Sequence, residues 1–239
     1  MIIPKNNGAL DGSPSSIPSK NDRFDFAKIE QEVYNLPETV DEATANQVKV
    51  ALEVIEEALR RYGTTALSLS FNGGKDCTVL LHLFAAALHR HLSSNPPQSI
   101  PTIPAIYITY PNPFPEVETF VDTCVRRYGL NLVRIPGPMK EALQQYIYLH
   151  KETGAILVGT RRNDPYSEHL THFIPTDPDW PPFMRIHPII DWTFAQVWNF
   201  LKVLDVPYSE LYDLGYACSR VVMVSETRGF LYIPRSSPI

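Results

Sequence analysis

Apolar residues recur with helical spacing in some segments of the chain and form short strand-like runs in others. Val48, Leu52, Ile55 and Leu59 lie on one face of a predicted helix, and Gly63 follows as a stop signal. Similar helical stripes lie at 79–88, 114–128, 139–150 and 193–204. Short apolar runs suited to strands lie at 66–71, 105–109, 130–135 and 155–158.

This alternation of strands and helices predicts the fold class. Strands that alternate with helices form βαβ units, and the strands of such units pair in parallel. We therefore expect an α/β fold built on an open, mostly parallel sheet with helices on both faces.

The segment 160–191 interrupts the alternation with six prolines and several charged residues. A loop of that length inside a compact domain is uncommon and is usually either functional or disordered. Trp180, Phe183, Met184 and Ile186 give the segment apolar anchors, which argues against disorder. We therefore expect a long, ordered loop with a functional role.

Composition and charge exclude several classes of protein. The 239 residues carry a net charge of −5, and the sequence pI is about 5.8. This mild acidity argues against a protein that coats nucleic acid. No apolar stretch approaches the roughly 20 residues that cross a bilayer, and the N-terminus lacks a secretory signal. We expect a soluble protein with neither a nucleic-acid nor a membrane partner.

Cysteine usage points to a reducing compartment. Cys77, Cys124 and Cys218 are widely spaced, odd in number and form no C-x-x-C pair, so we expect a cytoplasmic protein with reduced thiols. Cys124 falls on an apolar helical stripe and is expected to be a small buried side chain. His169 and His172 have no partner at zinc-site spacing, so we expect a solvated loop there rather than a metal site.

Residues 70–77 read Ser-Phe-Asn-Gly-Gly-Lys-Asp-Cys and fall between a predicted strand and a predicted helix. Glycines allow a sharp turn that brings backbone N–H groups close to an anion, and the start of a helix favours negative charge. Lys75 would add a mobile positive charge. The segment is not a Walker A motif, because the first glycine is missing and Asp76 replaces the Ser or Thr. It predicts a phosphate-binding loop; an ordinary turn is the alternative.

Three predicted strands end in residues suited to a ligand site, namely Ser70, Thr109 and Gly159. Ligands of open parallel sheets bind at the carboxyl ends of the strands. Two arginines follow Gly159, and guanidinium groups bind phosphate oxygens with two hydrogen bonds. The alternative is a solvated basic loop tip. Asp164 has either a role in the site or only that of a turn former.

Several segments together resemble a known family. Residues 70–77 resemble the pyrophosphate loop of the superfamily of ATP pyrophosphatases and sulfonucleotide (PAPS) reductases. The segments that resemble its eukaryotic FAD synthase (FMN adenylyltransferase) branch are 159–166, 176–185, 191–192 and 207–216. The resemblance implies a PAPS reductase-like FMN adenylyltransferase domain at 23–216. Its expected reaction joins FMN and ATP to give FAD and pyrophosphate.

The resemblance also implies which residues form the site. On the ATP side it implies Ser70, Asn72, Gly73, Gly74, Lys75, Asp76, Ile108, Gly159 and Arg161. On the flavin side it implies Thr160, Arg162, Asp164, Asp177, Pro178, Asp179, Trp180, Arg185 and Ile186. Within these sets the expected catalytic residues are Asn72, Arg161 and Asp164. Asp76 either helps to hold Mg²⁺ or stabilises the start of the helix, and a monomer is expected.

The two ends of the chain differ from the predicted domain. Residues 1–22 are rich in Pro, Ser, Asn and Gly and are expected to be a disordered tail. At 217–220 the chain reads Ala-Cys-Ser-Arg where the family reads Thr-Ser-Leu-Gly, and 217–239 matches none of the family's C-terminal arginine segment. This departure leaves a non-catalytic flavin or nucleotide binder as an alternative. A sulfonucleotide reductase with Cys218 as nucleophile is a further one.

Overall fold

The computed structural model describes residues 23–94 and 102–216, so the predicted tails at 1–22 and 217–239, with Cys218, lie outside the described residues. Its helices are α1 (Phe26–Asn35), α2 (Glu42–Tyr62), α3 (Lys75–Ser94), α4 (Pro115–Tyr128), α5 (Met139–Leu149) and α6 (Phe194–Val203). Two short 3₁₀ turns are η2 (Leu36–Glu38) and η3 (Glu210–Tyr212). The strands are β1 (Leu67–Ser70), β2 (Ile103–Thr109), β3 (Leu130–Pro136), β4 (Ala155–Leu157), β5 (Phe173–Pro175) and β6 (Met184–Ile186).

The strands form one sheet in the order β3-β2-β1-β4-β6-β5. Every neighbouring pair is parallel except β5 and β6, which pair antiparallel at the edge. The four strands predicted from apolar runs are β1 to β4, and the helices predicted between and after them are present. The predicted open, mostly parallel α/β fold is therefore confirmed.

The segment 160–191, expected to be one long loop, instead contains β5 and β6. Each strand has only three residues, which is too short to show a repeating pattern in the sequence. Their pairing comes from neighbours, since β6 lies in register with β4 at Ala155↔Met184. The sheet thus extends into the segment that follows Gly159.

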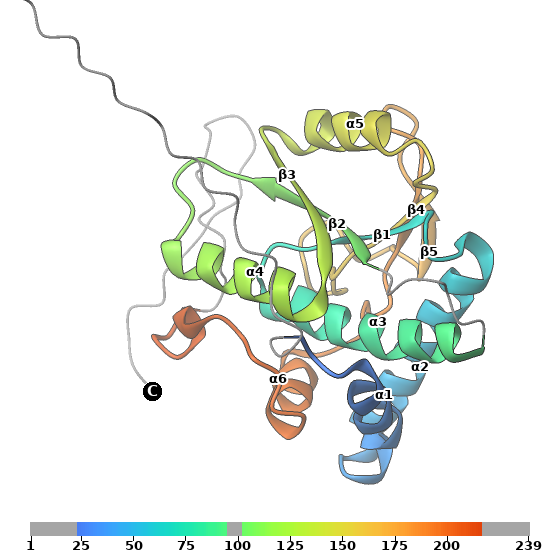
Figure 1. The fold of residues 1–239 in the computed structure, drawn as a ribbon, viewed down its shortest axis with the longest axis vertical. Coiled ribbons are helices and arrows are strands. Elements are labelled where there is room, and N and C mark those ends of the chain that lie inside the picture. Colours follow the sequence, from blue (N-terminus) through green and yellow to red (C-terminus); the bar gives the residue numbers. More distant parts are fainter. Residues whose placement is uncertain (1–22, 95–101, 217–239) are drawn as a thin grey trace, which may run out of the picture.

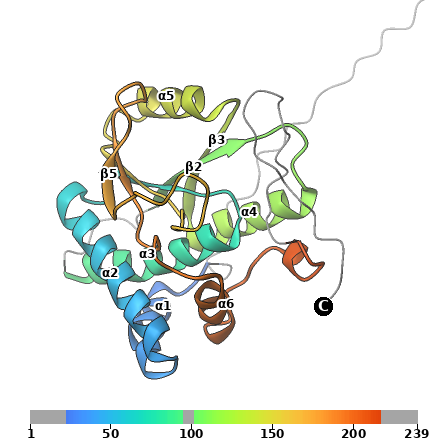
Figure 2. The ribbon, with the colours of Figure 1, turned by 180° about the vertical axis from the view of Figure 1, so that it is seen from behind.

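Helices cover both faces of the sheet, as expected. In Figures 1 and 2, α5 lies on one side of the sheet and α1, α2, α3, α4 and α6 lie on the other. The alternating side chains of β1 contact the helices on both faces of the sheet. Leu67 and Leu69 belong to the large core formed with α2 and α3. The hydroxyl of Ser68, between them, accepts a 3.0 Å hydrogen bond from the hydroxyl of Tyr146 on α5. Among the described residues, no helix combines the length and apolar character required to span a bilayer.

Two histidines are buried inside this fold. His82 on α3 is 3% exposed, and burial lowers its pKa to about 3. His187, just after β6, is 2% exposed, and its pKa is lowered to about 4 by burial, with Arg185 and His172 contributing. Both imidazoles are thus held neutral in the folded protein at neutral pH.

We expect acid to destabilise the protein through these two histidines. An unfolded histidine takes up a proton as the pH falls below about 6.5, whereas the folded ones do so only near their lowered pKa values. The stability that these two histidines contribute by remaining neutral is therefore fully present above pH 6.5, and it falls as the pH drops toward 4. Between pH 7 and pH 5 each histidine should cost about 2 kcal/mol. Urea unfolding at both pH values measures the loss.

His187→Gln is the matching variant for this prediction. It removes one of the two titrating groups, so the difference between pH 7 and pH 5 should shrink by about half. An unchanged difference would mean that His187 takes no part in the acid sensitivity.

Candidate active site

The predicted phosphate loop joins the end of β1 to the start of α3. The N–H of Phe71 still donates to the carbonyl of Ile106 at 2.9 Å, so the pairing with β2 continues one residue beyond β1. Gly73 then turns the chain with a φ of 73°, in the left-handed region that favours glycine. The side-chain oxygen of Asn72 accepts the N–H of Gly74 at 3.0 Å and closes the turn.

Gly73 is also fixed by its neighbours on α4. A Cβ at this position would lie 2.9 Å from Cγ2 of Val121 and 3.2 Å from Cγ1 of Val117. Real Cβ atoms essentially never come that close to another heavy atom, so the loop rests on α4 only because residue 73 has no side chain. Of the two adjacent glycines, Gly73 is therefore the position at which the structure requires a glycine.

Gly159 brings the next strand end against the same helix. A Cβ on Gly159 would lie 3.1 Å from the backbone nitrogen of Cys77 and 3.2 Å from the carbonyl carbon of Asp76. These are backbone atoms of the first turn of α3 and cannot move aside cheaply. The missing side chain lets the chain that follows β4 pass directly over the start of α3.

This approach assembles three charged groups at the start of α3. The ammonium of Lys75 lies 3.0 Å from Oδ2 of Asp76, and Nε of Arg161 lies 2.9 Å from Oδ1 of the same carboxylate. The second contact is an ion pair without hydrogen-bond alignment, since neither of its atoms has a hydrogen-bond partner. Lys75 is 5% exposed and Arg161 is 9% exposed. Two cations around one carboxylate leave a net positive charge beside the positive end of a helix, which favours an anion.

Lys75, expected to be a mobile charge, is instead held in place. Its ammonium lies 5.4 Å from the ring centre of Phe194 and 5.7 Å from that of Tyr212, within the range of cation–π attraction. Its backbone N–H also donates to the Tyr212 hydroxyl at 2.9 Å. The expectation of mobility is therefore wrong, because the charge is buried among aromatic rings and Asp76.

Asp164 shapes the turn that carries Arg161. Its carboxylate accepts the backbone N–H of Arg161 at 2.8 Å, and its own N–H donates to the Arg161 carbonyl at 2.9 Å. This is the geometry of a turn former, one of the two readings left open by the sequence. In this turn Asp164 holds the backbone of the arginine that reaches Asp76.

The neighbouring Arg162 is directed elsewhere. Its guanidinium pairs with Asp191, and its Nη1 donates to the carbonyls of Glu168 and Leu170 at 3.0 and 3.1 Å. The hydrogen bond from Arg162 lowers the pKa of Asp191 below its ordinary value. Arg162 therefore braces the loop after β4, whereas Arg161 faces the phosphate loop.

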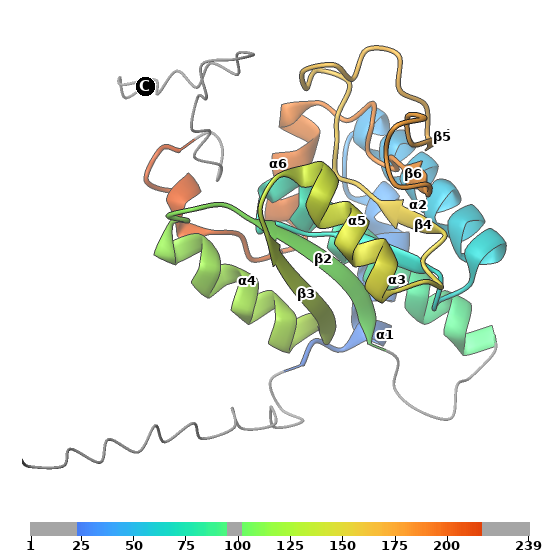
Figure 3. The same cartoon turned by 90° about the horizontal axis from the view of Figure 1, so that it is seen from above.

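Of the predicted flavin-side residues, Asp177, Pro178, Asp179 and Trp180 lie together at the hairpin between β5 and β6, and Arg185 and Ile186 lie on β6. Thr160, Arg162 and Asp164 instead lie with Arg161 in the segment after β4. Asp177 lies 3.6 Å from Nη2 of Arg185, and Asp179 pairs with Lys140 of α5 at 2.9 Å. Trp180 packs against the apolar cluster between the sheet and α5, as do Phe183 and the partly buried Ile108 and Val158. The turn thus lies on the α5 face of the sheet, and it joins β6 at its amino end (Figure 3).

A backbone hydrogen bond in the sheet connects the hairpin to the strand end beside the phosphate loop. The N–H of Val158, next to Gly159, donates to the carbonyl of Ile186 at 2.8 Å. Among the described residues we find no hydrogen bond or ion pair from Asp177, Asp179 or Trp180 to the phosphate loop. Ser70 and Thr160 are half-buried near the loop, whereas Pro178 is exposed on the hairpin.

The expected magnesium ligand is not free in this arrangement. Both carboxylate oxygens of Asp76 face cations, Lys75 on one side and Arg161 on the other. Among residues 23–94 and 102–216, no three His, Cys, Asp or Glu side chains gather closely enough to hold a metal ion. These residues therefore do not fit a metal site formed by the protein alone.

Cys77 and Cys124 have structural surroundings. The thiol of Cys77 lies 3.0 Å from the side-chain oxygen of Asn72, where it supports the turn. Cys124 is 1% exposed, and burial raises its pKa to about 12. The predicted buried position of Cys124 is confirmed. The Nδ1 atom of His172 lies 2.9 Å from the carbonyl of His187 in the continuation of the hairpin.

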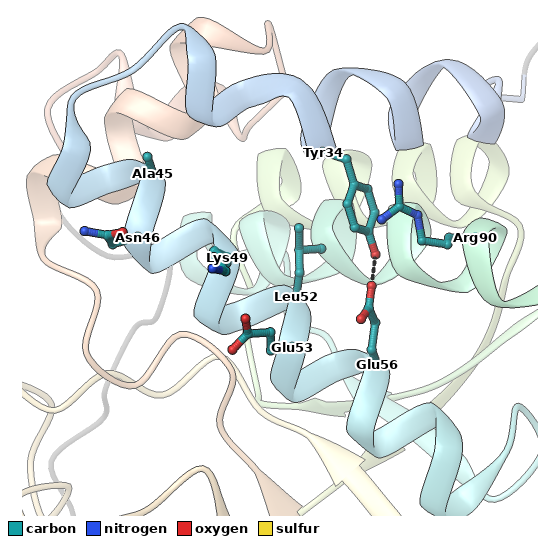
Figure 4. A pocket seen from close by; sticks show the side chains of 8 residues that line it. All are labelled: Tyr34, Ala45, Asn46, Lys49, Leu52, Glu53, Glu56 and Arg90. Atoms are coloured by element: carbon teal, nitrogen blue, oxygen red, sulfur yellow. Dashed lines mark hydrogen bonds between the residues drawn. The ribbon is translucent and has the colours of Figure 1, made fainter.

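A separate hollow of about 350 Å³ lies between α1 and α2 (Figure 4). It contains none of the predicted site residues. Two of its charged side chains contact Tyr34: the hydroxyl of Tyr34 donates to Glu56 at 2.5 Å, and the guanidinium of Arg90 lies 3.3 Å from the centre of the Tyr34 ring.

Sequence reasoning missed two side chains of the site, Tyr212 and Phe194. Both are aromatic residues that reach Lys75 from segments far along the chain. The segment 207–216 resembles part of a known family, but no spacing or charge pattern in it indicates the contact with Lys75.

Comparisons with known proteins show which family the chain belongs to. The model of the phosphoadenosine phosphosulfate reductase domain family matches residues 66–151 and 137–219. A probable FAD synthase of Schizosaccharomyces pombe is 40% identical over 171 residues, which cover 72% of this chain and 64% of the relative. The chain spans between 32% and 64% of the length of four FAD synthase relatives that it matches.

A solved structure has a similar fold. The Candida glabrata FMN adenylyltransferase in complex with FAD and inorganic pyrophosphate superimposes with a TM-score of 0.73 at 29% identity, covering 81% of this chain and 71% of that one. A phosphoadenosine 5'-phosphosulfate reductase of Xylella fastidiosa is 27% identical over 179 residues, covering 63% of this chain and 68% of the relative. The chain therefore belongs to the phosphoadenosine phosphosulfate reductase domain family, and within that family it resembles FAD synthases more closely than this reductase.

Proposed function

We propose that the protein transfers AMP from ATP to FMN, giving FAD and pyrophosphate. The observation that carries this proposal is the positive group of Lys75, Asp76 and Arg161 at the start of α3, beside a glycine turn. That group supports binding of a polyphosphate. The similarity to FAD synthases, together with the Candida glabrata enzyme's complex with FAD and pyrophosphate, supports the choice of substrates.

The ATP side of the site is assigned to the edge that carries the phosphate loop. Arg161 neutralises phosphate charge, while the glycine turn presents backbone amides to the pyrophosphate portion. The remaining residues assigned here are Ser70, Asn72, Gly74, Ile108 and Gly159.

The flavin side is assigned to the hairpin and its neighbours. Trp180 offers a ring against which the isoalloxazine can stack, and Asp177 offers an acceptor. Thr160, Arg162, Asp164, Pro178, Asp179, Arg185 and Ile186 complete this side. Because Asp177 and Trp180 lie apart from the phosphate loop, the flavin would have to extend across the α5 face to bring its phosphate to Arg161.

The reaction needs mainly positioning and charge neutralisation. A phosphate oxygen of FMN attacks the α-phosphorus of ATP, the bond from that phosphorus to the bridging oxygen of the β-phosphate breaks, and pyrophosphate leaves with the electron pair. Developing negative charge falls on the phosphates next to Arg161. Mg²⁺ would enter as the counter-ion of ATP and pyrophosphate, and we place no protein ligand on it. We further propose a cytoplasmic monomer.

Incubating the full chain with ATP, MgCl₂ and FMN tests the proposal. FAD and pyrophosphate should form in equal amounts, measured by chromatography and a pyrophosphate assay. Quenching of flavin fluorescence without turnover would instead support a non-catalytic flavin binder. Release of sulfite from a sulfonucleotide, lost in Cys218→Ser, would support a reductase.

A further inference from the structure

The hydroxyl of Tyr212 accepts a hydrogen bond from a backbone N–H that a bound phosphate would also use. Tyr212 lies in η3, 137 residues beyond the phosphate loop, and its oxygen accepts the backbone N–H of Lys75 at 2.9 Å. Lys75 is the first residue of α3. The first N–H groups of a helix have no acceptor within the helix and commonly bind anions. A side chain of the protein therefore fills one of the positions expected for the polyphosphate.

The ring of Tyr212 is held firmly in this position. Trp198 on α6 packs edge-on against it, with ring centres 5.4 Å apart at 82°. The Lys75 ammonium lies 5.7 Å from the same ring. The contact thus links the C-terminal part of the described chain to the backbone and the side chain of one loop residue.

We propose that Tyr212 sets the affinity of the site for polyphosphate by competing with it for the N–H of Lys75. This inference rests on the proposed function, because it takes the phosphate loop as the polyphosphate site. Without a ligand, the Tyr212 hydroxyl satisfies the amide, so a phosphate that takes this amide must first break an existing hydrogen bond. The contact weakens the binding of ATP and of pyrophosphate, and it favours release of pyrophosphate after the transfer.

Tyr212→Phe tests the competition, since it keeps the ring and removes the acceptor. Calorimetric titration of the full chain with MgCl₂ and pyrophosphate, and with MgCl₂ and ATP, measures both affinities. The loss of a competing hydrogen bond should tighten each by about three- to tenfold, the effect of one neutral hydrogen bond. Affinity for FMN, which has no polyphosphate, should stay as in the unsubstituted protein.

Tyr208→Phe is the matched control. Tyr208 belongs to the same aromatic cluster, with its ring 5.0 Å from that of Trp198, but its hydroxyl bonds Asp213 rather than the loop. The affinity of the Tyr208→Phe variant for pyrophosphate should equal that of the unsubstituted protein.

A melting experiment supplies a second readout. Tyr212→Phe should melt at a lower temperature than the unsubstituted protein when no ligand is present, because the Lys75 amide loses its acceptor. Pyrophosphate should then raise its Tm by more than it raises that of the unsubstituted protein. A purely structural role for Tyr212 would lower Tm without this larger gain.

The inference is overturned if Tyr212→Phe binds pyrophosphate as weakly as the unsubstituted protein, or more weakly. Weaker binding would show that the hydroxyl itself holds the phosphate. The titrations do not depend on catalysis, so a chain that binds pyrophosphate but forms no FAD would refute the proposed function and still test Tyr212.

Discussion

Gly73→Ala should destabilise the protein by about 2–5 kcal/mol and abolish nucleotide binding. The left-handed backbone at Gly73 costs a residue with a side chain about 1–2 kcal/mol. Overpacking against Val121, which would lie 2.9 Å from the new Cβ, adds about 1–3 kcal/mol. If the loop moves away from α4 to relieve this contact, the amides at the start of α3 lose their arrangement. Urea unfolding and calorimetric titration with ATP measure the two losses.

Gly129→Ala separates backbone strain from crowding. Gly129 has a φ of 67°, close to that of Gly73, but the nearest atom to an added Cβ is Cζ of Arg23 at 3.2 Å. An arginine side chain can move aside, so this variant should lose only about 1–2 kcal/mol and bind ATP normally. Equal losses in the two variants would refute the contact with α4 as the reason for Gly73.

The sequence was most informative where a local pattern decides the structure. A strand run, the Gly-Gly turn and a helical stripe are contiguous, so the loop around Gly73 and its place between β1 and α3 could be predicted. The same holds for Gly159, which ends a buried strand and lies at the carboxyl edge of the sheet.

Contacts between distant segments were not predictable in this way. The sequence predicts a mobile charge at Lys75, because no residue near it in the sequence indicates the contacts with Phe194 and Tyr212. Strands β5 and β6 are defined by their neighbours rather than by periodicity, so 160–191 looked like a loop. In both cases the decisive interaction joins residues whose separation along the chain hides it.

The adjacent arginines show the same limit on a smaller scale. From the sequence, Arg161 and Arg162 differ only in position, and the resemblance alone assigned one to phosphate and the other to flavin. In the structure Arg161 reaches Asp76, while Arg162 turns to Asp191 and the carbonyls of its own loop. Substitution of each arginine should therefore impair a different property of the protein.

Arg161→Ala should lower kcat/KM for ATP by about 10²–10³, the usual effect of removing one donor that stabilises transferring charge. It takes a buried cation from the phosphate loop and leaves Asp76 paired with Lys75 alone, which cancels the net positive charge there. Steady-state formation of FAD measures the loss. Arg134→Ala is the control: in the described part of the chain, this exposed arginine forms ion pairs only with Glu118 and Asp122 of α4, so the variant should keep full activity.

Arg162→Ala should instead act through the loop after β4. Without its side chain the carbonyls of Glu168 and Leu170 lose a donor and Asp191 loses its partner, so Tm should fall by more than in Arg161→Ala. Any kinetic loss should then appear in the KM for FMN, because the loop connects to β5 and the hairpin. If Arg162→Ala weakens ATP binding as much as Arg161→Ala does, the two arginines act as one phosphate-binding pair and the assignment from their contacts is wrong.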